Sequence, residues 1–134
     1  MTLKQIKDFF KSTTGWTDGI SIGKIDNNLD KAVCFYNSRH PTAKIGDVGG
    51  KENKSYDFKS ITILLRWTTN ADEAEKKAEE IYNFFDEKTF IHDKKRVFVI
   101  SRFENPIDLG TDERGVYEYS FEFDLYSEKI KEEE

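Results

Sequence analysis

The sequence predicts an α+β domain in which an antiparallel β-sheet carries two helices packed on one face, in the order α-β-β-β-α-β-β. Residues 115–126 (GVYEYSFEFDLY) alternate aromatic or aliphatic side chains with polar ones, which is the period of a strand with one buried face. Two other segments, residues 3–10 and 70–85, carry apolar side chains at helical spacing. The remaining apolar segments follow one another without an intervening helix, which favours antiparallel pairing.

The first helix and the two strands after it have local signals. Thr2 and Gln5 have the spacing of a capping box, and Gly15 is a typical C-terminal stop. Residues 20–25 (ISIGKI) and 31–38 (KAVCFYNS) predict two strands joined by a turn. The second strand is expected inside the sheet because both of its alternating phases are apolar: Val33 and Phe35 on one face, Ala32, Cys34 and Tyr36 on the other.

Residues 56–68 form the longest predicted strand, and its apolar phase changes at Lys59 and Ser60. This change predicts either a β-bulge or a strand that passes from one neighbour to another. Asn70 then caps the second helix, with Glu73 at the capping-box position.

Beyond the second helix, residues 96–103 predict a strand, and residues 105–114 connect it to the final one. The final strand is expected to place Phe121 and Phe123 against the second helix, at Ile81, Tyr82 and Phe85. The full buried phase is Tyr117, Tyr119, Phe121, Phe123 and Leu125. The opposite phase, expected to be solvated, is Glu118, Ser120, Glu122 and Asp124.

Length and composition indicate one globular domain, residues 1–126, followed by a charged tail, residues 127–134. Charged residues make up 35% of the 134 residues, and no apolar run approaches the roughly 20 residues that cross a bilayer. The N-terminal segment does not have the pattern of a secretion signal, so synthesis in a cytoplasm is expected. The net charge of −5, from 21 basic and 26 acidic residues, argues against a broad nucleic-acid surface.

The sequence contains no recognisable catalytic, cofactor-binding or metal-binding motif. The glycines at 46, 49 and 50 do not have phosphate-loop spacing, and a Ser or Thr does not follow Lys51. With His40 and His92 as the only histidines and Cys34 as the only cysteine, a zinc site is not expected. Cys34 lies in an apolar run and is interpreted as a core residue. We therefore expect no enzyme activity and no cofactor.

The one candidate site is the long segment 39–55, which is expected to form a loop that is mobile in the free subunit. It is basic within an acidic protein, so docking on an acidic partner surface is one interpretation and a solvated connector is the other. The candidate assembly residues are Arg39, Lys44, Ile45, Val48, Lys51 and Lys54.

Three segments together resemble the tail-terminator proteins of long-tailed bacteriophages, including families labelled minor capsid protein in prophage regions. They are residues 105–126 (NPIDLGTDERGVYEYSFEFDLY), 70–85 (NADEAEKKAEEIYNFF) and 61–67 (ITILLRW). The resemblance implies a structural virion protein, made in the bacterial host cytoplasm, that forms a six-fold ring on the tail tube. Its implied partners are other copies of itself, the tail tube protein and the head-tail connector protein, with no membrane and no sequence-specific nucleic acid.

A neighbouring connector protein of similar size would give a similar pattern. The alternative from a different class is a small-molecule-binding module or enzyme resembling the nuclear transport factor 2 superfamily. In that fold the aromatic side chains of the last strand would line a pocket between sheet and helices.

Overall fold

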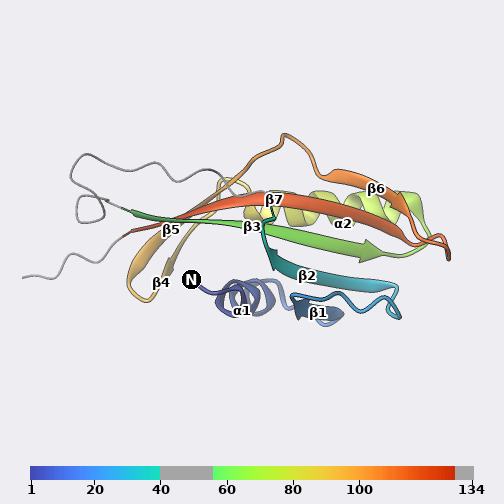
Figure 1. Ribbon diagram of the computed structural model, residues 1–134, viewed down its shortest axis with the longest axis horizontal. Helices are drawn as coiled ribbons and strands as arrows, with labels where there is room; N and C mark the ends of the chain where they lie inside the picture. Colours follow the sequence, from blue (N-terminus) through green and yellow to red (C-terminus); the bar gives the residue numbers. More distant parts are fainter. Residues whose placement is uncertain (40–55, 129–134) are drawn as a thin grey trace, which may run out of the picture.

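The computed structural model describes residues 1–39 and 56–128 (Figure 1). The elements follow the order α1 Leu3–Thr14, β1 Gly19–Ile22, β2 Lys31–Asn37, β3 Tyr56–Trp67, α2 Ala71–Phe85, β4 Thr89–His92, β5 Lys95–Ser101, β6 Ile107–Thr111 and β7 Tyr117–Glu128. The strands form one sheet in the order β1-β2-β3-β7-β5-β4, and β6 pairs with β7. The predicted α+β fold is confirmed, with β4 and β6 as two additional short strands.

The long pair of β3 and β7 forms the centre of the sheet. Their antiparallel register is continuous from the pair Tyr56 and Glu128 to the pair Trp67 and Tyr117. On its other side, β3 is paired with β2 only from Ile61 onward. The phase change predicted near Lys59 and Ser60 is therefore not a bulge; it lies where β3 gains its second neighbour.

The prediction that consecutive strands are antiparallel is wrong for β1 and β2, which are parallel. The reason is that residues 23–30 cross the sheet face opposite the helices, which we call the outer face, and return the chain to the end where β1 began. Ile25 is buried in this crossing, packs with Ala32 and Cys34, and donates its amide to the Tyr36 hydroxyl at 3.0 Å. This small second core explains why both phases of β2 are apolar.

The other predicted connection, residues 105–114, contains β6, which pairs with β7 across an irregularity between Asp108 and Gly110. Gly110 has a positive φ of 82° at this point, a conformation that glycine adopts without strain. The strand was missed because only Ile107 and Leu109 in it are apolar, and every residue of it except Ile107 is exposed. At its C-terminal end, β7 continues to Glu128, so two residues of the predicted tail lie in the strand.

The main core lies between the helices and the inner face of a curled sheet (Figure 1). α1 contacts strands on both sides of the curled sheet. Phe10 packs on Phe35 of β2, and Phe9 stacks on Phe90 of β4 with ring centroids 3.9 Å apart. Phe10 also stacks on Phe85 of α2 at 5.5 Å. One aromatic cluster therefore holds together the two helices, β2 and the edge strand β4.

The predicted packing of the last strand is confirmed: Phe121 and Phe123 are buried, and the Phe123 ring contacts Phe85 and Tyr82. Cys34 is fully buried, as expected for a core residue. The predicted caps are also present. Thr2 and Gln5 form the capping box of α1, Gly15 ends that helix in the left-handed conformation, and Asn70 accepts the Glu73 amide of α2. The capping box expected with Glu73 is not closed, because the Asn70 amide donates to the Thr68 hydroxyl instead.

Candidate functional site

The structure describes only Arg39 of the six candidate assembly residues. Arg39 is exposed and lies two residues after the end of β2. With Thr62 and Glu122 it lines an open hollow of about 270 Å³ on the outer face. The others lie outside the described residues: Lys44, Ile45, Val48, Lys51 and Lys54. The interface predicted for this segment therefore stays a prediction.

The middle of the outer face is an ordered polar network, whereas solvated side chains were expected there. Glu122 of β7 accepts hydrogen bonds from the hydroxyls of Ser38, at 3.1 Å, and Thr62, at 2.9 Å. Two residues further along β7, on the same face, Asp124 pairs with Arg102 at 2.8 Å and accepts a hydrogen bond from the Ser60 hydroxyl at 2.7 Å. The expectation failed because the alternation of β7 says nothing about its surroundings: β3 supplies Ser60 and Thr62, and Ser38 and Arg102 follow the ends of β2 and β5.

Near the β3–α2 end of the sheet, the outer face is closed over a buried arginine. Arg66 of β3 is 2% exposed, and its guanidinium contacts Asp112 at 2.6 Å and Glu118 at 3.6 Å. It also donates to the carbonyl oxygens of Asn27 and Leu29, in the crossing after β1. Arg66 thus links the β1–β2 connection to the turn before β7.

Asp112 is held as a carboxylate by this arrangement. The hydrogen bond from Arg66, supported by the backbone amides of Val116 and Arg114, lowers the pKa of Asp112 from 3.8 to about 2. Each of these donors stabilises the charged form. This cluster of paired groups fixes two loops to β3.

The opposite end of the outer face is apolar and open. Register places β3, β7, β5 and β4 side by side there, with Phe58, Tyr126 and Phe98 in one row across the sheet. We call this surface the outer apolar patch; its residues are Tyr56, Phe58, Ile91, Phe98, Ile100 and Tyr126. Ile91 is 68% exposed, Tyr56 46%, and Phe98 and Ile100 37% each. In the sequence, this patch was indicated only by Tyr56 and Phe58. In the alternation of β3 these two residues point to the face opposite the core residues.

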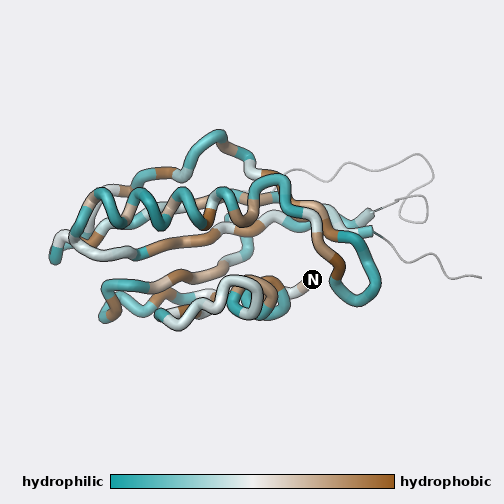
Figure 2. Tube along the Cα trace, turned by 180° about the vertical axis from the view of Figure 1, so that it is seen from behind, coloured by the Kyte–Doolittle hydropathy of each residue, from teal (hydrophilic) through white to brown (hydrophobic). Residues whose placement is uncertain are grey.

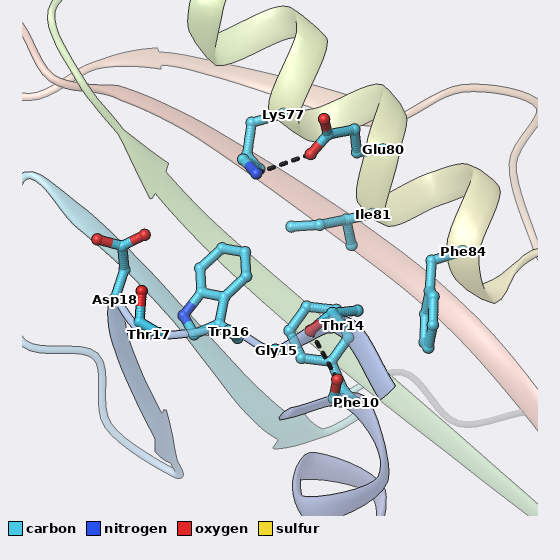
Figure 3. A pocket seen from close by; sticks show the side chains of 10 residues that line it. All are labelled: Phe10, Thr14, Gly15, Trp16, Thr17, Asp18, Lys77, Glu80, Ile81 and Phe84. Atoms are coloured by element: carbon cyan, nitrogen blue, oxygen red, sulfur yellow. Dashed lines mark hydrogen bonds and ion pairs between the residues drawn. The ribbon is translucent and has the colours of Figure 1, made fainter. Parts of the chain in front are cut away.

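A hollow of about 260 Å³ lies between the end of α1 and α2 (Figure 3). Four of its polar side chains already have partners: Lys77 pairs with Glu80 at 2.7 Å, the Thr14 hydroxyl donates to the Phe10 carbonyl, and the Trp16 indole donates to the Gly19 carbonyl. Thr17 and Asp18 also line the hollow. Lys77 also lies over the rings of Trp16 and Trp67. Ligand pockets usually combine apolar walls with convergent polar groups, and in this hollow most of the polar side chains are bonded within the protein.

The aromatic side chains of β7 do not form a pocket, as the small-molecule alternative required. Tyr119, Phe121 and Phe123 are buried in the main core. Within the described residues, no group of three or more His, Cys, Asp and Glu side chains is placed to hold a metal ion. No described helix is long and apolar enough to cross a membrane.

A family model described as bacteriophage tail terminator protein matches residues 4–128. The chain belongs to this family. The resemblance seen in the sequence is thereby confirmed, and the match extends over all nine described elements except the first residue of α1. Searches of the curated proteins and of the solved structures gave no match. As a tail terminator family member, the chain is a structural component of a phage virion.

Proposed function

We propose that this protein caps the tail tube of a long-tailed bacteriophage as a ring of identical subunits, six in number, and joins the tube to the head connector. The observation that carries the proposal is the family match over residues 4–128. In this proposal the protein is made in the cytoplasm of the bacterial host, becomes part of the virion, and has no catalytic activity and no cofactor. Its partners are other copies of itself, the tail tube protein and the connector protein.

The distribution of surface charge supports a role around a channel. The exposed side of α2 carries Asp72, Glu73, Glu75, Glu79 and Glu80, and only Lys76 and Lys77 oppose them. Figure 2 shows this helix as hydrophilic along most of its length. An acidic surface repels the phosphate backbone of DNA. Placed toward the lumen of a ring, it would let DNA pass without binding it.

The test is co-expression with the tail tube protein from the same phage genome, followed by negative-stain electron microscopy. With this protein present, tubes should carry a ring at one end and stop growing; without it, they should lengthen without limit. Connector protein that is added afterwards should bind only to the capped ends of the tubes. Tubes that grow equally long and bare in both cultures would contradict the proposal. Binding of the protein to the connector with no binding to tubes would identify a connector component instead.

A further inference from the structure

We propose that the outer apolar patch is the surface through which one copy of this chain binds a second copy. The inference rests on the proposed function, because it names one contact surface of the proposed ring. In a cyclic ring the patch of one subunit meets a different surface of the next.

The patch is one continuous surface. Tyr126 is the direct cross-strand partner of both Phe58 and Phe98, and its ring lies 5.2 Å from those of Phe58 and Tyr56. Direct partners in an antiparallel sheet point to the same face, so Ile91 and Ile100 extend the same surface onto β4 and β5. Aromatic and aliphatic side chains gathered on an open sheet face are typical of an interaction site.

No described part of the chain lies over this patch, whereas two other parts of the outer face are covered or paired. Residues 23–30 and the turn at Asp112 close over Arg66, and hydroxyls and Arg102 pair the carboxylates in the middle. The chain outside the described residues supplies few apolar side chains to cover it. Its large aliphatic residues are Ile45, Val48 and Ile130, against six apolar residues in the patch.

Charge favours a second copy as the occupant. The charged groups beside the patch are paired with opposite sign, Arg96 with Glu128 at 2.9 Å and Arg102 with Asp124 at 2.8 Å. The charges of these two pairs cancel within each pair, in a chain of net charge −5. Two copies of an acidic protein repel each other where their acidic surfaces meet. A second copy can therefore approach the outer apolar patch at a lower electrostatic cost than the acidic exposed side of α2.

The first test is the oligomeric state of Phe98→Asp, measured by sedimentation velocity over a range of protein concentrations. The matched control is Leu109→Asp, which places the same charge at an exposed apolar residue of β6, away from the patch. Wild type and the control should self-associate equally, and Phe98→Asp should weaken the association at least about tenfold, as for a central interface residue. Thermal unfolding verifies that all three are folded. A wild type that stays monomeric at the highest attainable concentration, or equal association of both variants, would overturn the inference.

The second test distinguishes a second copy from other occupants. Because Cys34 is buried, a thiol introduced by Thr89→Cys beside Phe98 would be the one exposed thiol of the described residues. Its reaction with a maleimide should slow as protein concentration rises, and that of the control Thr111→Cys on β6 should not. Slow reaction at every concentration would show that the chain's own segment covers the patch. Slowing only when tail tubes are added would show that the tube does. Both results would overturn the inference.

These outcomes are separable from those of the proposed function. If Phe98→Asp associates normally and still caps tubes, the patch assignment fails while the terminator function stands. If wild type associates through the patch but leaves tubes uncapped, the proposed function fails while the self-contact stands.

Discussion

The guanidinium of Arg66 lies 2.6 Å from the carboxylate of Asp112, and this pair joins two loops that are far apart in the sequence. Arg66 comes from β3, and Asp112 from the turn that leads into β7. Because Arg66 is almost fully buried, it depends on Asp112, Glu118 and two loop carbonyls for compensation. At the end of the sheet where the chain crosses after β1, this ion pair therefore acts beside the small apolar core of Ile25, Ala32 and Cys34.

The first prediction concerns acid stability. The pKa of Asp112 is lowered to about 2 in the folded state, so the unfolded state binds more protons as the pH falls. The stabilisation is complete above a pH of about 4 and is lost as the pH falls through about 2. Asp112→Asn should be less stable than wild type at neutral pH, with a difference that shrinks across this window. Urea unfolding at a series of pH values measures it, with Glu113→Gln as the control from the same turn. A pH-independent difference would contradict the role of Asp112.

The second prediction compares the two faces of β7. Phe123→Ala removes a fully buried ring that contacts α2 and should cost about 3–5 kcal/mol in the free energy of unfolding. Glu122→Ala should cost about 1 kcal/mol, because it breaks hydrogen bonds to Ser38 and Thr62. A fully solvated glutamate would cost less than about 0.5 kcal/mol. Denaturant unfolding distinguishes these values, and equal losses for the two variants would contradict the assignment of faces.

The sequence was most informative where the signal is local. Alternation in residues 115–126 and the caps at Thr2 and Asn70 involve neighbours in the chain, so β7, α1 and α2 were predicted closely. Pairings between distant segments left weaker signals. The parallel pairing of β1 with β2 depends on residues 23–30 crossing the sheet, and the short, mostly polar β6 is stabilised by its pairing with β7.

The candidate site shows the same limit. The outer apolar patch combines residues from four strands, and each strand contributes only one or two of them. Taken singly, Ile91 or Phe98 is an ordinary exposed apolar residue. Only the cross-strand register brings them together, and register cannot be read from one strand at a time.

The third prediction concerns the hairpin between β4 and β5. Asp93 and Lys94 form its two-residue turn and have positive φ angles of 50° and 63°. A lysine is strained in this conformation, and a glycine is not. Lys94→Gly should therefore raise the free energy of unfolding by about 0.5–1 kcal/mol. The control Lys95→Gly, in the adjoining strand, should lower it. A loss of stability for Lys94→Gly in the same urea series would contradict the turn assignment.

The fourth prediction concerns residues 40–55, the segment between β2 and β3 that contains five of the six candidate assembly residues. Deleting residues 43–51 and bridging the ends should leave the melting temperature nearly unchanged, because the cost of loop closure depends only weakly on loop length. If the basic side chains of this segment dock on an acidic partner surface, the same deletion should abolish capping of tail tubes. A matched full-length variant, Lys44→Gln with Lys51→Gln and Lys54→Gln, should slow tube binding, and wild-type binding should slow as salt is added. Co-sedimentation with purified tubes measures both. A shortened protein that melts normally and still caps tubes would show that the segment is a solvated connector.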